Sequence, residues 1–378
     1  MRKFIFFVKK KQVSKPRIQL MVARIDYMVD EPSDELKMVE FNLHSVGVHE
    51  ISNLYNFLLK TVLIPNEAID FKPSENYLQV AKLLGHGVDE YEKLYLTAKT
   101  TILFVTFAND LNILYYRHIE ICLWKLGYTV KVRSLDQLGS LVKRDEIDNR
   151  LLVEGDEVSL VYFRTLPDET NFGDDNFESV IRPVELSRAI KVPDIGQVLI
   201  SFKPFQQYFT QNGHVFERFN DLVESCSEMR RVLMDLRPIN DLNFVNQVLS
   251  KPQDYVLKLS YGEGGGGCLF GNDLKLKLEY WKDNWESSSF ERSNFLLMKK
   301  ILPPSIENIQ VNQGYEWKRD LFNAEFGFYG GLISVDGKIL SNNFIGSCVR
   351  SKRSQDNEVG LCASRGKLSS VIVENKNM

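Results

Sequence analysis

A strand–helix–strand pattern in the first half of the chain constrains the fold more than any other feature. Residues Thr101–Phe107 form a short run of β-branched and aromatic side chains, which is typical of a buried strand. The segment Leu111–Leu126 carries apolar residues at helical spacing, with Asp110 placed to cap it and Gly127 placed to end it. Tyr128–Val132 then predicts a second strand. Two strands joined by a helix within about 30 residues make a βαβ unit, so we expect a parallel sheet.

The second half of the chain predicts antiparallel strands combined with helices. The expected strands are Tyr255–Lys258, Leu296–Ile301, Glu325–Val335 and Lys338–Ile345, with Ser159–Arg164 as a further strand of the first half. The expected helices are Asn176–Ile190 and Gly196–Phe209, followed by a polar helical pattern to about Leu249. Asp336-Gly337 is typical of a two-residue hairpin turn. We therefore predict a mixed α/β and α+β fold with a boundary between residues 190 and 250.

Composition agrees with a soluble globular protein and excludes several classes of partner. The 378 residues are 44% hydrophobic and 26% charged, enough for two or three compact units with sizeable cores. The net charge is −3 and the sequence pI about 6.1, whereas a nucleic-acid binder normally shows a basic domain. No apolar run is long enough to cross a membrane. We therefore expect neither nucleic acid nor a membrane as a partner.

The cysteines and the N-terminus both indicate a cytoplasmic protein. The five cysteines are odd in number, scattered and without a CxxC pair, which favours reduced thiols over disulfides or a zinc site. The first residues are basic, but the apolar run that follows is too short for a signal peptide and no cleavage site follows it.

A glycine-rich loop is the strongest single candidate for a binding site. The strand that includes Lys258 leads into Gly262–Gly267, which contains Glu263 and four consecutive glycines. Glycine lets backbone N–H groups approach an anion closely. The loop fits neither a Walker A motif nor the dinucleotide fingerprint. It is equally compatible with a mobile surface loop between two strands.

Lysines and oxygen ligands elsewhere in the chain favour a polyphosphate site. Lys191, Lys258, Lys300 and Lys352 each lie in or beside a predicted strand, and several lysines converging on phosphates would give charge-assisted contacts. Each of them, taken singly, is compatible with a solvated surface residue.

Glu40 and Asn42 alternate along a predicted strand, so their side chains point to the same side. Together with Glu263 they offer the oxygen ligands that Mg²⁺ takes alongside phosphate. The alternative for the first two is an exposed polar strand face.

Several ordered motifs together resemble the eukaryotic glutathione synthetase family. The motifs are Arg24-Ile-Asp-Tyr-Met28, Glu40-Phe-Asn42, Val161-Tyr-Phe-Arg164, Ser187-Arg-Ala-Ile-Lys-Val-Pro-Asp-Ile195, Tyr255-Val-Leu-Lys258 with Glu263-Gly-Gly-Gly, Phe295–Ile301, Glu325–Gly330 and Val349-Arg-Ser-Lys352. They follow the family's order from about Met21 to Leu368, with the helical segment ahead of Arg24 largely missing. The resemblance implies an ATP-grasp fold, with ATP held between two β-rich lobes. It also implies a homodimer that ligates γ-glutamylcysteine to glycine through an acyl phosphate.

The resemblance also implies a domain division and a set of site residues. Residues 1–100 would be the N-terminal part of the ATP-grasp core, 101–190 the substrate-binding βαβ domain, and 191–378 the ATP-binding lobes with glycine loop and lid. The implied Mg²⁺ ligands are Glu40, Asn42 and Glu263. The implied ATP contacts are Glu40, Lys191, Lys258, Gly264, Gly265, Gly266, Gly267, Phe270, Met298, Lys299, Lys300, Ile301, Glu325, Lys352 and Glu358. The implied substrate contacts are Arg24, Ser45, Asn112, Tyr116, Arg164, Arg350, Leu361 and Cys362, with Arg350 and Lys352 as catalytic residues.

The departures from the family pattern gather on the peptide-substrate side. Tyr116 stands where the family has a substrate-binding Gln, Gly47 where it has a second Ser, and Pro167 where it has a Tyr. In the nucleotide half, Gly262 is inserted, Gly267 and Cys268 replace an Asn pair, Phe270 replaces a Tyr, and Lys299 replaces an acidic residue. We expect Tyr116 to project into the cysteinyl-substrate pocket. Three hypotheses therefore stand: a glutathione synthetase, a diverged ligase with another donor or acceptor, and a catalytically silent ATP-binding paralogue acting as an effector.

Overall fold

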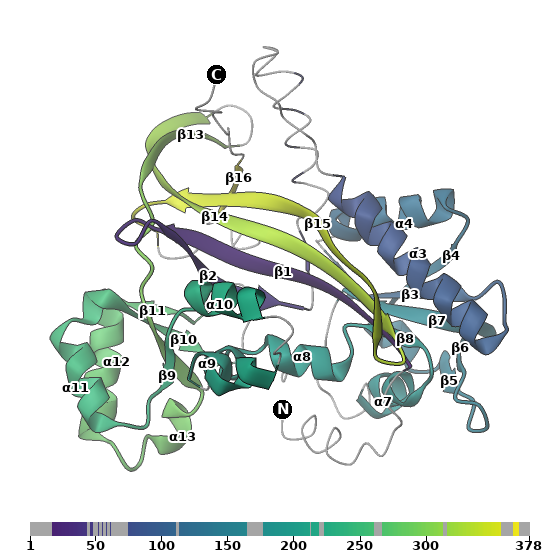
Figure 1. The fold of residues 1–378 in the computed structure, drawn as a ribbon, viewed down its shortest axis with the longest axis horizontal. Helices are drawn as coiled ribbons and strands as arrows, with labels where there is room; N and C mark the ends of the chain where they lie inside the picture. Colours follow the sequence, from purple (N-terminus) through teal and green to yellow (C-terminus); the bar gives the residue numbers. More distant parts are fainter. Residues whose placement is uncertain are drawn as a thin grey trace.

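Three β-sheets organise the part of the chain that the structure describes (Figure 1). The computed structural model describes residues 17–43, 46–47, 75–110, 113–164, 177–211, 213–218, 223–260, 267–312, 316–356 and 366–369, with isolated residues between 52 and 61. A long antiparallel sheet runs through the middle, a mostly parallel sheet with α3 and α4 lies at one end, and a small sheet with three helices lies at the other. The prediction of a mixed α/β and α+β fold is confirmed.

The long sheet joins the two ends of the chain. Its order is β16-β15-β14-β1-β2, with β13 also paired to β14, and all its pairs are antiparallel. Its strands are β1 (Ile18–Asp30), β2 (Glu35–Asn42), β13 (Ile306–Asn312), β14 (Glu316–Val335), β15 (Lys338–Arg353) and β16 (Lys367–Ser369). Pairing of β1 with β14 runs from Ile18 opposite Val335 to Tyr27 opposite Phe326. The segment around Arg24 is therefore held by strands some 300 residues later.

The predicted hairpin between β14 and β15 is confirmed. Asp336 and Gly337 have φ of 49° and 82°, the positive values that a tight hairpin turn requires at both central positions. Both strands are longer than predicted, since β14 begins at Glu316 and β15 ends at Arg353. The extra residues at the start of β14 mix charged with apolar side chains, and those from Glu316 to Phe322 pair with β13.

The parallel sheet contains the predicted βαβ unit. Its order is β4-β3-β7-β6-β5, with β8 also paired to β7, and β3 is parallel to both β4 and β7. The strands are β3 (Thr101–Thr106), β4 (Thr129–Ser134), β5 (Val142–Arg144), β6 (Leu151–Val153), β7 (Asp156–Phe163) and β8 (Ile190–Val192); the helices beside them are α3 (Asn76–Tyr95), α4 (Leu114–Lys125) and α5 (Leu135–Leu138).

The ends of α4 test the predicted caps. Gly127, just past the helix, has φ of 93°, a left-handed value that suits the end of a helix, so that prediction is confirmed. The prediction that Asp110 caps the helix is wrong. The chain turns at residues 108–109, and α4 begins later, after Ile113, which makes no side-chain cap.

The two helices predicted between residues 176 and 209 are each interrupted. The first becomes a π-turn (Phe177–Ile181) and α7 (Arg182–Leu186), and the chain then enters β8 instead of continuing as a helix to Ile190. The second divides into α8 (Ile195–Ser201) and α9 (Lys203–Gln211). Pro204 has no N–H to donate to the preceding turn, which explains the break at Phe202.

The small sheet has the order β11-β10-β12-β9 and is entirely antiparallel. Its strands are β9 (Leu236–Pro238), β10 (Tyr255–Leu259), β11 (Leu269–Phe270) and β12 (Phe295–Lys299); the remaining helical segments are η3 (Gly213–Arg218), α10 (Val223–Val232), α11 (Leu242–Ser250), η5 (Pro252–Asp254), α12 (Gly271–Asp283) and α13 (Ser289–Arg292). One core packs α11 and α12 on this sheet around Trp281. A second core, including Met28 and Met298, joins the small sheet to β1. Strand β9 lies inside the region expected to be helical, and at three residues it is too short to show a strand pattern.

One core ties α3 to both of the larger sheets. It contains Leu20 of β1, Leu84 of α3, Phe104 of β3 and Tyr329 of β14, all of them fully or almost fully buried. The described helices include none that is both long enough and apolar enough to pass through a membrane.

The contact between Gly346 and Asn76 generates a stability prediction. A Cβ on Gly346 would lie 1.7 Å from Oδ1 of Asn76, which is fully buried and donates from Nδ2 to the Ser347 carbonyl at 3.0 Å. We expect Gly346→Ala to lower the free energy of unfolding by about 1–3 kcal/mol or more, measured by denaturant unfolding. Gly330→Ala is the matched control, because a Cβ there meets nothing within 4 Å. Equal effects of the two substitutions would contradict the prediction.

Candidate functional site

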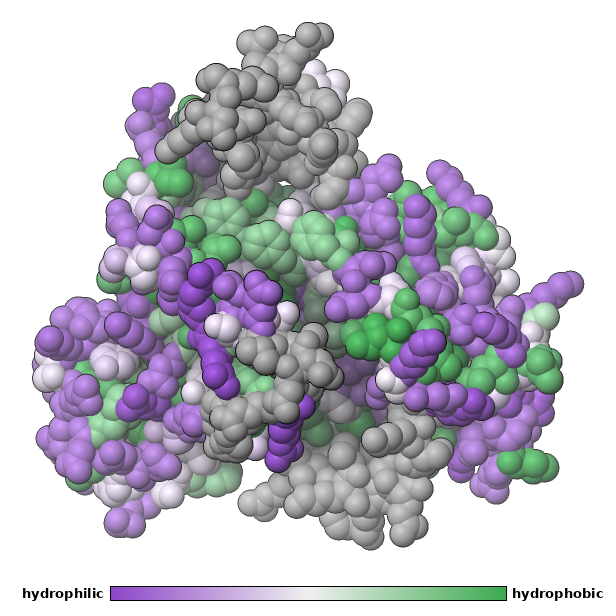
Figure 2. Space-filling view, viewed as in Figure 1, coloured by the Kyte–Doolittle hydropathy of each residue, from purple (hydrophilic) through white to green (hydrophobic). Residues whose placement is uncertain are grey.

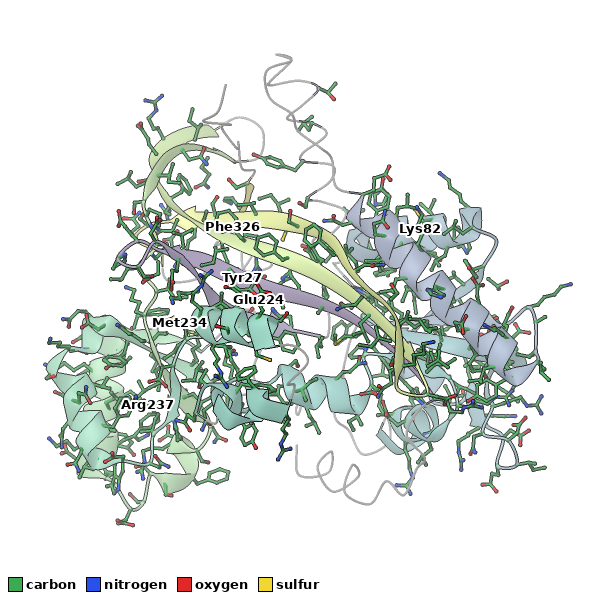
Figure 3. The ribbon with its side chains drawn as sticks, viewed as in Figure 1. Tyr27, Lys82, Glu224, Met234, Arg237 and Phe326 are labelled. Atoms are coloured by element: carbon green, nitrogen blue, oxygen red, sulfur yellow. The ribbon has the colours of Figure 1, made fainter. Side chains whose placement is uncertain are left out.

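The two faces of the long sheet differ in chemistry. Tyr27 and Phe326 lie side by side on neighbouring strands in Figure 3, and Phe328 contacts the Tyr27 ring at 5.7 Å between centroids. Figure 2 shows hydrophobic residues gathered over these central strands. Alternation along β1 and β14 sends the neighbouring charged side chains to the opposite face. We call the buried side chains of Arg24, Asp26, Glu325 and Arg350 on that face the charged face.

Asp26 lies at the centre of the charged face. Arg24 donates to both of its carboxylate oxygens, from Nε at 2.8 Å and from Nη2 at 2.9 Å. Arg350 reaches Oδ2 of Asp26 at 2.8 Å and also pairs with Glu325. Asn42 donates to the same Asp26 oxygen at 3.0 Å. Strands β1, β2, β14 and β15 thus each contribute one or two side chains to one network.

Glu40 and Asn42 point to the same side of β2, as predicted. The Asn42 amide donates to Glu40 at 3.3 Å as well as to Asp26, so its carbonyl oxygen faces away from both carboxylates. Burial opposes ionisation of Glu40, but the positive charges of Lys203, Lys258 and the two arginines outweigh it and lower its pKa to about 2. An ionised carboxylate beside an amide oxygen fits Mg²⁺, which prefers oxygen ligands. Among the described residues no group of three or more His, Cys, Asp or Glu forms a metal site, and the predicted third ligand, Glu263, lies outside them.

Two lysines, Lys258 and Lys203, act on this network from other parts of the chain. Lys258 of β10 is buried and donates to the Val39 carbonyl at 3.1 Å. Burial lowers its pKa, while Glu40 and Glu325 oppose that shift. Lys203, at the start of α9, acts electrostatically on both Glu40 and Lys258. Lys191 of β8 is buried and donates to the Ser187 carbonyl at 2.7 Å, so the strand after α7 holds it in place.

The predicted nucleotide-holding strand is β12. Met298 and Ile301 are buried in the core beneath Phe270, whereas Lys299 is exposed. The Lys300 ammonium lies 6.0 Å from the centre of the Phe270 ring.

Two further predicted residues, Glu325 on β14 and Arg350 on β15, lie opposite one another. Burial raises the pKa of Glu325 above its ordinary value, with Arg350 opposing and with Asp26 and Glu40 adding to the rise. Lys352 faces Asn323 across the same two strands, two residues beyond Arg350. Their roles in ATP binding and catalysis stay predictions.

The predicted substrate side is built at the ends of β7 and β2. Arg164 follows β7, is buried, and donates to the Val46 carbonyl at 2.5 Å. Tyr329 donates its hydroxyl to the Gly47 carbonyl at 2.8 Å. A Cβ on Gly47 would lie 3.1 Å from the Tyr115 ring and 3.4 Å from the Arg164 guanidinium. The position where the family has a serine is therefore closed by Tyr115.

Tyr116 lies in the core between α4 and β3. Its ring is 3% exposed and packs edge-on against Phe104, with 6.2 Å between centroids. Its role in substrate binding stays a prediction. The other calls on this half of the site, with part of the glycine loop and the lid, lie outside the described residues: Ser45, Asn112, Pro167, Gly262, Gly264, Gly265, Gly266, Glu358, Leu361 and Cys362.

Asp26, Lys203 and Tyr115 belong to this environment, but we did not single them out from the sequence. Asp26 had a usable signal, because it alternates with Arg24 on one strand and short-range alternation puts both on one face. Lys203 had none, since only the packing of α9 brings it near Glu40. Tyr115 is adjacent to a predicted contact, yet its approach to Gly47 depends on how α4 docks.

Comparisons with known proteins show the family to which the chain belongs. A family profile described as the ATP-binding domain of eukaryotic glutathione synthase matches residues 4–373. The chain is 28% identical to glutathione synthetase of Dictyostelium discoideum, with 96% of this chain and 78% of that protein covered. It is 26% identical to the chloroplastic enzyme of Solanum lycopersicum, over 94% of this chain and 64% of the other. For Homo sapiens glutathione synthetase the identity is 26%, over 90% and 72%.

Among solved structures, the chain resembles a glutathione synthetase-like effector from Globodera pallida in its apo form. The TM-score is 0.74 at 21% identity, with 93% of this chain and 77% of the other covered. The likeness concerns the fold, and the predicted ATP-grasp fold is confirmed.

The low pKa of Glu40 predicts how stability depends on pH. Its folded-state pKa of about 2 lies below the ordinary value of 4.5, so ionised Glu40 stabilises the fold fully above pH 4.5 and loses that contribution as the pH falls toward 2. Glu40→Gln should therefore cost up to about 3 kcal/mol at neutral pH and progressively less in acid. Denaturant unfolding at a series of pH values measures this difference. Parallel pH profiles for the two proteins would show that Glu40 carries no such charge coupling.

Proposed function

Because the chain belongs to the eukaryotic glutathione synthase family, whose members are ATP-dependent carbon–nitrogen ligases, we propose that it ligates γ-glutamylcysteine to glycine using ATP and Mg²⁺. The observation that supports this most directly is that oxygen ligands and positively charged side chains lie together at the charged face. Carboxylate and amide oxygens on β2 lie beside two buried arginines and the buried Lys258. Such a site offers ligands for a cation, cations for phosphates and guanidinium groups for a carboxylate.

In the first step, the γ-phosphate of ATP passes to an oxygen of the donor's carboxylate, giving an acyl phosphate and ADP. Lys258 and Lys191 are each held by a backbone carbonyl, so their ammonium groups are already placed when the phosphates arrive. Mg²⁺, held by Glu40 and Asn42, would neutralise phosphate charge. Phosphoryl transfer depends mainly on this positioning and electrostatic stabilisation.

In the second step, the amine of glycine attacks the acyl carbon, phosphate leaves, and the amine loses a proton. Arg24 and Arg350 project from one sheet face and are buried, which suits carboxylates of the two substrates. Arg164 is a third buried arginine and lies beside Val46 and Gly47. The reactive acyl phosphate requires that water be kept out, so a buried set of arginines is better suited than a solvated one.

A direct assay tests the proposal. We expect ADP release that requires γ-glutamylcysteine, glycine and Mg²⁺ together, and calorimetric binding of Mg-ATP. Lys258→Ala should weaken ATP binding about 10- to 100-fold, because one charge-assisted contact to phosphate is lost. Lys275→Ala is the control, since Lys275 is exposed on α12 and lies 3.8 Å from Glu279. A folded wild-type chain that binds no Mg-ATP would refute the proposal.

One observation favours a second candidate, a ligase of the same class with a different donor. Gly47 stands where the family has a serine, and the Tyr115 ring occupies the space which that side chain would need. A glycine in place of a hydrogen-bonding serine removes a polar partner for the substrate, and the Tyr115 ring lies close to that position. A buried polar group left without its partner costs about 1–3 kcal/mol, enough to change which donor binds best.

Under this second candidate, Tyr115→Ala should raise kcat/KM for γ-glutamylcysteine relative to other γ-glutamyl donors, by about tenfold. The physical reason is that the shortened side chain reopens the space beside Gly47 and Arg164. Steady-state kinetics with a panel of donors measures the ratio. Tyr208→Ala, at an exposed tyrosine of α9, should leave the ratio unchanged. Good use of γ-glutamylcysteine by the wild type, with no gain in Tyr115→Ala, would leave only the first candidate.

A further inference from the structure

We infer that Asp26 is a positioning residue that sets the orientation of the two arginines that receive the substrate carboxylates. The inference rests on the proposed function and adds to it a residue outside the predicted set. Asp26 is 0% exposed. It accepts hydrogen bonds from Arg24 on its own strand and Asn42 on β2, and it forms an ion pair with Arg350 on β15.

The geometry of these contacts fixes the orientation of the two guanidinium groups as well as compensating their charge. Arg24 binds Asp26 through two separate bonds, one to each carboxylate oxygen, which locks the plane of its guanidinium. Arg350 is held from two sides, by Asp26 and by Glu325. Its Nε is buried and has no acceptor among the residues that the structure describes, so this donor is available to a bound carboxylate.

Asp26 is better suited to this role than to binding a metal. Its Oδ1 accepts from Arg24, and its Oδ2 accepts from Arg24 and Asn42 and also pairs with Arg350. A metal would have to displace these donors and would then face two guanidinium groups. The Asn42 amide, in contrast, is turned by its bond to Asp26 so that its oxygen points away from the carboxylates. Asn42 also donates to Glu40, so it keeps an acceptor when Asp26 is replaced. Asp26 is therefore needed to orient the two arginines on the substrate side and not the residues on the metal side.

The two possible roles of Asp26, charge balance and positioning, predict opposite effects on substrate binding when a neutral residue replaces it. If Asp26 only balanced charge, Asp26→Asn would leave a more positive site and tighten the binding of anionic substrates. If Asp26 positions the arginines, the same change removes the second acceptor oxygen and weakens peptide binding, because the amide cannot receive both bonds from Arg24.

The test compares the KM for γ-glutamylcysteine with the KM for ATP in variants of Asp26. Asp26→Asn should raise KM for γ-glutamylcysteine about 10- to 100-fold, since bonds to charged groups are lost, while KM for ATP changes by no more than about twofold. Asp26→Glu restores the charge but moves the oxygens by about 1.5 Å, so it should show the same split. Glu157→Gln is the control, because Glu157 also pairs with an arginine, Arg188, but on the parallel sheet.

Several outcomes would overturn the inference. They are an unchanged or lowered KM for the dipeptide in Asp26→Asn, equal rises in both KM values, and recovery of wild-type constants by Asp26→Glu. If Asp26→Asn does not fold, Asp26→Glu alone decides between positioning and charge balance. If the wild type has no ligase activity, the proposed function fails separately. Calorimetry with γ-glutamylcysteine then tests Asp26 directly: weaker binding to both folded variants supports the inference, and unchanged binding refutes it.

Discussion

The register between β1 and β14 is the constraint on which the site depends. It aligns Asp26 with Gly327, so that no side chain stands directly opposite the carboxylate on β14. A Cβ on Gly327 would lie 3.0 Å from Asp26 Oδ1 and 3.1 Å from the Arg24 side chain, so only glycine leaves room for the pair. A one-residue slip would send Arg24 and Asp26 to the apolar face and bring Ile25 and Tyr27 among the charges. Because apolar burial opposes that slip, the hydrophobic pattern of the strands also protects the register of the charges.

The buried charges stabilise the fold only as a set. Arg24, Arg350 and Lys258 bring positive charge, and Asp26, Glu40 and Glu325 bring negative charge, in a region with little access to water. Breaking one buried pair usually costs more than the pair contributes, because the remaining charge is left without compensation. The surroundings of the two glutamates differ. Neighbouring positive charges lower the pKa of Glu40, whereas burial and neighbouring carboxylates raise the pKa of Glu325.

The departures from the family pattern that the sequence predicts gather on the peptide side of the site, and the structure offers a physical reason for this. The charged face is held by four strands, so a change there disturbs several partners at once. The peptide side is formed by the segment after β2 and the helix α4, where Gly47 and Tyr115 meet at one contact. A change at one contact can reshape this side of the site without affecting the sheet. A change on the peptide side can therefore leave the residues of the charged face in their places.

The sequence by itself determined the type of each sheet and most residues of the site. The βαβ unit, the Asp336-Gly337 turn and the alternation of Glu40 with Asn42 are local patterns, and local backbone geometry is enough to interpret them. Tertiary structure alone decided the place of Tyr116 in the core and the approach of Lys203 to Glu40. It also decided that Asp26 lies between two arginines. Arg350 is more than 300 residues away along the chain, and only the pairing of β1 with β14 and of β14 with β15 brings it to Asp26.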